Sequence, residues 1–154
     1  MTAFERLDAP TRAALILRTA FRQARFVAKE LPTKGSVLLV GDRPAPDAPD
    51  DVTFHYTPFG ALKHSSLWLN LQLHDAGIPE ERLYWTNAYD HKGNPTGYEV
   101  LDTEAQVIAL GGNADVWVKK HQRLGHWKVQ HPQAWKRFRS AEPYPLIECL
   151  SFLR

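Results

Sequence analysis

Short apolar runs recur along this chain, and each of them ends in polar residues or glycines. Continuous apolar runs of this length are typical of strands that are buried on both faces of a parallel sheet. The stretches are Val37 to Val40 followed by Gly41-Asp42-Arg43-Pro44, Leu83 to Trp85 followed by Thr86-Asn87, Val107 to Leu110 followed by Gly111-Gly112, and Val129 followed by Gln130-His131-Pro132.

The segments between these runs carry the signals of helices. From Pro10 to Leu31 an apolar stripe lies opposite a basic face; Asp8 or Thr11 can cap this helix, and Pro32 ends it. Further helices are predicted from Ser65 to Asp75, ended by Gly77, from Asn113 to Leu124 and, as a short helix or turn, from Gln133 to Arg139. The Pro- and Asp-rich stretch 44–51 and the turn-rich stretch 89–97 are expected to be loops.

The alternation of strands and helices predicts a three-layer α/β fold, in one domain over residues 1–154. Its mostly parallel central sheet has about four strands, with helices on both faces. Parallel strands end at one edge of a sheet, and open α/β sheets bind ligands at that edge. We therefore expect Asp42, Asn87, the glycine turn at Gly111 and His131 to form one site.

The distribution of charged residues along the chain is more informative than the net charge. The formal net charge of the 154 residues is +2, which does not by itself argue for a nucleic acid partner. From Val116 to Arg139, however, the chain has many lysines and arginines and no acidic residue. This segment either neutralises phosphates or forms the solvated face of a helix.

Several classes of site are disfavoured by residue usage. Cys149 is the single cysteine, which excludes an internal disulfide, a cysteine-rich zinc site and a cysteine-held iron–sulfur cluster within one chain. No histidine pair has the His-x-x-x-His spacing of metalloproteases. No apolar run approaches the ~20 residues that span a bilayer, and the N-terminus lacks the apolar stretch of a signal peptide. A reducing cytoplasm and no membrane association are expected.

Several short motifs follow one another in a fixed order along the chain. They are Gly41-Asp42-Arg43-Pro44, Pro58-Phe59-Gly60, Ser66-Leu67-Trp68-Leu69-Asn70, Gly77-Ile78, Thr86-Asn87, Lys92-Gly93-Asn94-Pro95, Val107 to Gly111 and His131-Pro132. The order of these motifs resembles the uracil-DNA glycosylase superfamily. It is most similar to the bacterial and archaeal branch whose first motif reads Gly-Glu-Ala-Pro-Gly, although the iron–sulfur cysteines of that branch are absent here.

This resemblance implies a DNA N-glycosylase that hydrolyses the bond between a sugar and an extruded uracil-like or modified pyrimidine. Phe59 would stack on the base and Asn87 would read its polar edge. Asp42 would support the water or the developing sugar cation, and His131 would stabilise the departing base. Arg43 departs from the family pattern and could fill the base pocket or bind a phosphate.

The resemblance also implies how DNA is held. The segment after His131-Pro132 would enter the minor groove, with Trp135 as the apolar wedge and Phe138 as the second candidate. The basic residues Lys136, Arg137 and Arg139 would neutralise phosphates. The implied partners are DNA and a free or flipped pyrimidine base, and the protein would act as a monomer with no metal and no cofactor.

Structural roles remain open for the same residues. Asp42 and Asn87 could cap loops, His131 could be a turn histidine, and Phe59, Trp135 and Phe138 could belong to the core. Two other functions also remain open. One is a catalytically silent DNA or modified-base binding module on this fold, which Arg43 favours, and the other is a phosphate or nucleotide binder that uses Gly111-Gly112 at a helix N-terminus.

Overall fold

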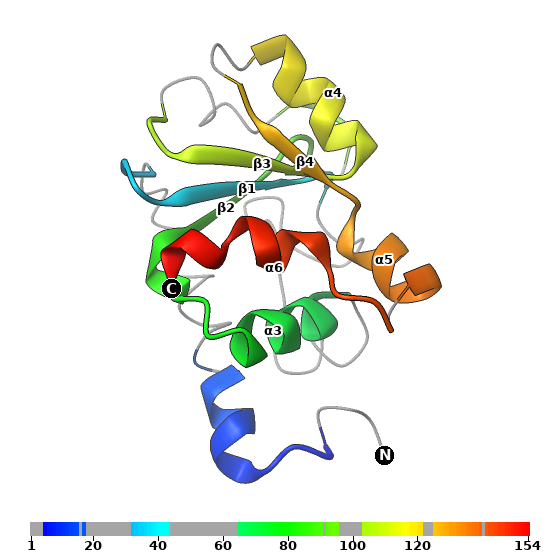
Figure 1. Cartoon of the computed structure of the whole chain (residues 1–154). Helices are drawn as coiled ribbons and strands as arrows, with labels where there is room; N and C mark the ends of the chain where they lie inside the picture. The colour runs from blue at the N-terminus through cyan, green and yellow to red at the C-terminus, as the bar shows by residue number, and fades with distance from the viewer. Residues whose placement is uncertain are drawn as a thin grey trace.

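The central sheet has four strands that all run parallel. The computed structural model describes residues 5–15, 17, 32–43, 65–90, 92–95, 103–121, 125–139 and 141–154. Within them, the strands are arranged in the order β2-β1-β3-β4 (Figure 1). Their bounds are β1 (Val37–Gly41), β2 (Leu83–Asn87), β3 (Gln106–Leu110) and β4 (Trp127–Val129).

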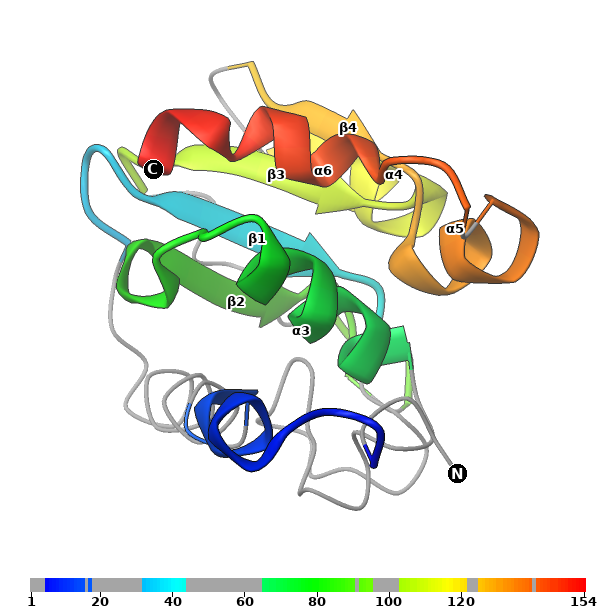
Figure 2. The same ribbon diagram turned by 60° about the horizontal axis from the view of Figure 1, so that its bottom comes forward.

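Helices cover both faces of the sheet, which confirms the predicted three-layer α/β fold. Helix α4 (Gly112–His121) lies on one face, and α3 (Ser65–Asp75) and α6 (Pro145–Cys149) lie on the other (Figure 1). The 3-10 turns η1 (Glu80–Arg82) and η3 (Ser151–Leu153) precede β2 and follow α6. Helix α5 (Pro132–Arg139) lies beyond the ends of the strands, on the side toward which β1, β2 and β3 point (Figure 2).

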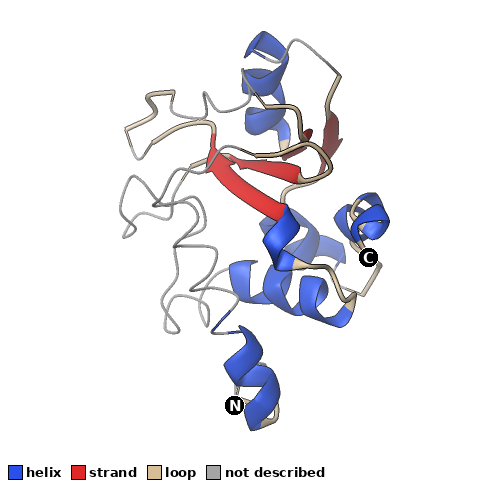
Figure 3. Cartoon of the chain, turned by 90° about the vertical axis from the view of Figure 1, so that its left-hand side faces the viewer, coloured by secondary structure: helices blue, strands red, loops and turns tan. Residues whose placement is uncertain are grey.

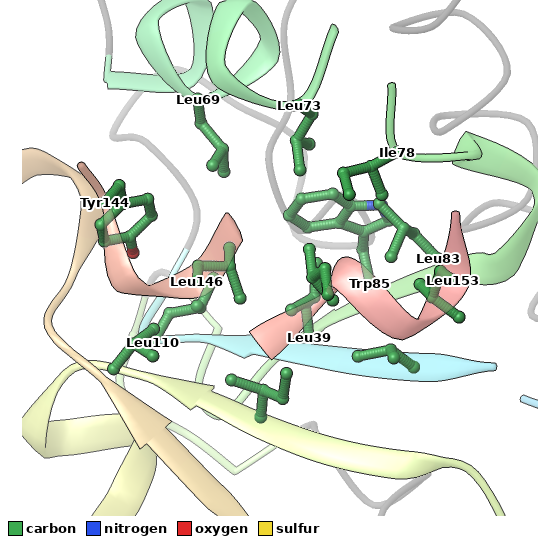
Figure 4. Packing of buried hydrophobic residues seen from close by; sticks show 14 residues of the cluster. Leu39, Leu69, Leu73, Ile78, Leu83, Trp85, Leu110, Tyr144, Leu146 and Leu153 are labelled. Atoms are coloured by element: carbon green, nitrogen blue, oxygen red, sulfur yellow. The ribbon is translucent and has the colours of Figure 1, made fainter. Parts of the chain in front are cut away.

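The alternation of side chains along β1 divides the core into two clusters. Val37 and Leu39 pack with residues of α3, α6 and η3, in the cluster that Figure 4 shows. Leu38 and Val40 pack with residues of α4 on the other face. Every residue of β1 is buried, as a strand between two helical layers requires. The continuous apolar runs of the sequence therefore have a simple cause, because neither face of the central strand meets water.

Two of the predicted helix ends are confirmed. The Asp8 carboxylate accepts a hydrogen bond from the Thr11 backbone N–H at 2.8 Å, which identifies Asp8 as the N-cap of the first helix. That helix is described at residues 9–15 and 17, beyond α3 from the sheet (Figure 3), and its predicted continuation lies outside the described residues. Gly77 has φ +68°, and the Ile78 N–H returns to the Leu73 carbonyl, which ends α3 in a Schellman motif.

The C-terminal segment forms elements that the sequence patterns did not predict. Leu146 of α6, Leu153 of η3 and Leu150 between them are buried in the cluster that also contains β1 residues. Tyr144, which precedes α6, is 1% exposed, and its hydroxyl donates a hydrogen bond of 2.7 Å to the Gln130 carbonyl oxygen. This bond fastens the start of α6 to the chain immediately before His131.

Replacement of Tyr144 by phenylalanine tests the bond to Gln130. Tyr144→Phe keeps the packing of the ring but leaves the Gln130 carbonyl without this donor, so we expect the free energy of unfolding to fall by about 1–3 kcal/mol. In a protein of this length, each kcal/mol lowers the melting temperature by roughly 2–4 °C. Thermal and urea denaturation measure the change. An unchanged stability would show that water replaces the hydroxyl at no cost.

Candidate functional site

The ends of all four strands meet at one edge of the sheet, as the sequence predicts. Asn87 ends β2, Asp42 follows β1, Gly111 follows β3, and His131 lies two residues after β4. Since the strand order is β2-β1-β3-β4, these residues are arranged along the edge in the order Asn87, Asp42, Gly111 and His131. The edge lies on the same side of the molecule as α5 (Figure 2).

Asp42 is fastened to the first turn of α4. Its Oδ2 accepts a hydrogen bond of 3.0 Å from the side-chain amide of Asn113. A carboxylate at this position is also favoured by the partial positive charge of the helix N-terminus. Asp42 Oδ1 is buried and accepts no hydrogen bond from any residue that the structure describes. The carboxylate is thus held by a partner that is distant in the sequence.

Arg43 lies beside this carboxylate. Its Nε is 3.8 Å from Asp42 Oδ1, which is close enough for attraction but too long for a hydrogen bond. The Arg43 side chain is 51% exposed and that of Asp42 is 29% exposed. Solvent therefore screens the pair, and the guanidinium keeps donors that can reach an anion outside the protein.

His131 is held as a neutral hydrogen-bond donor. Its Nδ1 lies 3.0 Å from the Gln133 backbone N–H, and since an amide nitrogen can only donate, Nδ1 must be the acceptor. The proton of the neutral ring is then on Nε2. Burial lowers the pKa of His131, and the Asp42 carboxylate opposes this shift with a smaller raising effect. His131 thus caps α5 with one nitrogen and carries a donor on the other.

The glycine turn after β3 makes room for His131. Gly111 has φ +104°, a conformation that side chains rarely adopt, and a Cβ at this position would lie 3.1 Å from the His131 Cβ. A pocket of about 450 Å³ opens between the ends of β3 and β4 and the start of α5. Its lining consists of Gly111, Gly112, Lys128, Val129, Gln130, His131 and Ala134.

Asn87 reaches the same edge from the other face of the sheet. It is paired in register with Gly41 and is only 3% exposed. Alternation along β2 places it on the face of Leu83 and Trp85, which pack toward α3 and α6, whereas Asp42 is bonded to α4. The structure therefore brings Asp42 and His131 within electrostatic reach of each other, and a ligand would have to lie across the edge to meet Asn87 as well.

The two aromatic residues of helix α5, Trp135 and Phe138, have different surroundings. Trp135 packs against the core, with its ring 5.9 Å from that of Tyr144 and its indole N–H donating to the Glu142 carbonyl at 3.2 Å. Phe138 is 71% exposed. Trp135 therefore packs against the core, which the wedge hypothesis did not include. Of the two aromatic residues of α5, Phe138 is the one that faces solvent.

The basic residues of α5 are exposed, as a phosphate-binding surface requires. Lys136, Arg137 and Arg139 all lie in the exposed part of the helix. The Arg137 guanidinium lies 5.3 Å from the centre of the Phe138 ring. Arg139 is 5.5 Å from the Trp135 ring and forms an exposed ion pair of 3.7 Å with Glu142. Such exposed contacts hold the side chains weakly, so the cations remain able to pair with phosphates.

Asn113 was not predicted as a site residue, and the predicted site residue Phe59 lies outside the described residues. The predicted loop at 44–51 also lies outside them. Asn113 carried a signal that was available, because it follows the glycine turn at the same sheet edge as Asp42 and begins a helix next to β1. No helix in the described part of the chain is both long enough and apolar enough to cross a membrane.

No protein-family model matches this chain, and no curated protein matches it. The resemblance to the uracil-DNA glycosylase superfamily is therefore carried by the motif residues alone.

Replacement of Gly111 by alanine tests the close approach of His131. The positive φ alone strains a residue that has a Cβ by about 1–3 kcal/mol, and the contact with His131 adds to that strain. Gly111→Ala should lower the melting temperature and shift the NMR signals of the His131 ring. Gly112→Ala is the matched control, since a Cβ there meets no described atom within 4 Å. Equal effects of the two substitutions would refute the proposed contact.

The partly buried His131 ring predicts a direction for the pH dependence of stability. Its pKa in the folded protein lies below the ordinary value of about 6.5. Its contribution to stability is therefore complete above pH ~6.5 and is lost as the pH falls through the folded-state pKa. NMR titration of the ring measures the pKa, and denaturation at several pH values measures the slope. His131→Gln should remove this component, and a pKa above 6.5 would contradict the prediction.

Proposed function

We propose that this protein is a DNA glycosylase-like enzyme that binds an extruded uracil-like or modified pyrimidine at the carboxyl edge of its sheet and hydrolyses the N-glycosidic bond. One observation carries the proposal: a neutral His131, with its proton on Nε2, lies within electrostatic reach of the Asp42 carboxylate at the same edge of the sheet, where β3 separates the ends of β1 and β4. The motif order that resembles the uracil-DNA glycosylase superfamily supports the choice of reaction.

The proposed reaction needs charges of opposite sign at two places. When the bond between the sugar carbon and the base nitrogen breaks, the base leaves with the electron pair and the sugar becomes positive. A carboxylate near the sugar and a hydrogen-bond donor near the base would therefore both favour the transition state. Water then adds to the sugar carbon, and its proton is released through a nearby base or solvent.

Asp42 and His131 suit these two roles for different reasons. In the proposal, the Asp42 carboxylate lies near the sugar, where it orients the water or supports the developing positive charge. His131 donates from Nε2 to the departing base. Because burial favours its neutral form, the ring would stabilise the departing anion by donating a hydrogen bond rather than by forming an ion pair.

Recognition of the base is assigned to Phe59 and Asn87. An aromatic ring can stack on an extruded base, and an amide supplies both a donor and an acceptor to a pyrimidine edge. Arg43 would bind a phosphate or contact the base, and Lys136, Arg137 and Arg139 would neutralise the DNA backbone. In this proposal the exposed Phe138 joins Trp135 as a candidate for the wedge beside the flipped nucleotide.

A catalytically silent module that binds DNA or a modified base is the second candidate. It is favoured by Arg43, whose guanidinium lies 3.8 Å from the carboxylate that the reaction would need. A cation at that distance opposes the development of positive charge on a sugar placed nearby. Binding without release of a base distinguishes this function from the first one.

Replacement of Asp42 by asparagine tests the catalytic proposal. Asp42→Asn should lower the rate of base release from uracil-containing or modified oligonucleotides by at least ~10²-fold, because it removes a positioned charge, while DNA affinity stays nearly unchanged. Mass spectrometry detects the released base, and gel shift measures binding.

Asp75→Asn is the matched control, because it makes the same change at the exposed C-terminal end of α3. Normal turnover of Asp42→Asn would remove Asp42 from the mechanism. Binding by the unmodified protein without any base release would favour the silent module instead.

A further inference from the structure

The Asn113 side chain is the described hydrogen-bond partner of the Asp42 carboxylate. The bond of 3.0 Å joins Asn113 Nδ2 to Asp42 Oδ2 across 71 positions of the sequence, from the first turn of α4 to the end of β1. Since β1 and β3 are adjacent and parallel, the helix that follows β3 begins beside the residue that follows β1. The contact is therefore produced by the register of the sheet.

The two oxygens of Asp42 have different surroundings. Oδ2 is occupied by the Asn113 amide, whereas Oδ1 is buried, faces Arg43 Nε at 3.8 Å and accepts no hydrogen bond from the described residues. A carboxylate that is fixed through one oxygen cannot rotate freely, so its other oxygen keeps one direction. Fixing a charged group before the reaction lowers the cost of reorganisation at the transition state.

We propose that Asn113 is a positioning residue that anchors the Asp42 carboxylate through Oδ2 toward the His131 side of the sheet edge, and so limits its pairing with Arg43 to the long contact of 3.8 Å. The inference rests on the proposed function for its meaning in catalysis, but the geometry that it describes exists in the protein without a ligand. Loss of the amide leaves the carboxylate beside Arg43, and it then closes onto the guanidinium. The pair would be partly neutralised and turned toward solvent, since the Arg43 side chain is half exposed.

The titration of His131 reports the position of Asp42 independently of activity. In the intact site the carboxylate raises the pKa of His131 against the larger lowering effect of burial. Asn113→Ala should therefore lower the pKa of His131, and Asp42→Asn should lower it at least as much. Because Asn113 acts through Asp42, the double variant should match Asp42→Asn alone.

Controls separate positioning from general damage to the fold. Asn113 is exposed, so its replacement leaves the core intact, and Asn113→Ser provides a second variant with a residue that suits the first turn of a helix. Asn94→Ala removes a similar amide-to-carboxylate bond, of 3.2 Å to Asp90, and should not change the pKa of His131. Circular dichroism verifies that each variant is folded.

The experiment is NMR titration of His131 in these variants, followed by kinetics of base release. We expect the Asn113→Ala substitution to lower kcat by about tenfold with little change in KM, and to have no further effect in the Asp42→Asn background. An unchanged pKa of His131 in both Asn113 variants, or a full additional shift in the double variant, would overturn the inference. If the unmodified protein releases no base, the proposed function fails, whereas the titration still decides the role of Asn113.

Discussion

The burial of β1 on both faces is the constraint on which the rest of this structure depends. Parallel strands cannot be joined by tight hairpins, so each connection must cross a face of the sheet, and the crossing helices cover the apolar surface. β1 is flanked by β2 and β3 in continuous register, and all of its residues are buried. The same register aligns the strand ends, so the requirement for a buried core also assembles the candidate site.

The site combines a fixed carboxylate with a neutral imidazole, and burial explains why the two differ. Asp42 remains close to solvent and is compensated by the Asn113 amide and the N-terminus of α4. His131 is partly buried against the glycine turn at the start of α5, where charging the ring would cost solvation. A negative group and a neutral donor therefore lie near each other without forming an ion pair. This arrangement suits a reaction in which opposite charges develop at two neighbouring places.

Helix α5 connects this site to the basic surface of the protein. His131 caps the helix, Trp135 anchors it against Tyr144, and the exposed turn carries Phe138 among cationic side chains. Because Tyr144 also bonds the Gln130 carbonyl, the C-terminal segment holds both ends of the short connection from β4 into α5. A ligand bound to the exposed face of α5 would therefore contact a helix whose first turn is hydrogen-bonded to His131.

Much of the architecture could be predicted because apolar periodicity is a local property. The runs around Leu39, Trp85 and Ile108 identify strands that are buried on both faces, and Asp8 and Gly77 mark helix ends by their own conformational preferences. The C-terminal helix α6 was not predicted, because it is only five residues long and its apolar pattern is too short to have a period.

The sequence by itself determined which polar residues would end the strands, and hence that Asp42, Asn87 and His131 would reach one edge. Only the tertiary structure decided what each side chain does there. It joined Asp42 to Asn113, placed Asn87 on the opposite face of the sheet, set the proton of His131 on Nε2 and turned Trp135 toward the core. The reason is physical: strand and helix propensities act over neighbouring residues, whereas hydrogen-bond partners, burial and pKa values depend on groups that are distant in the sequence and meet only when the chain folds.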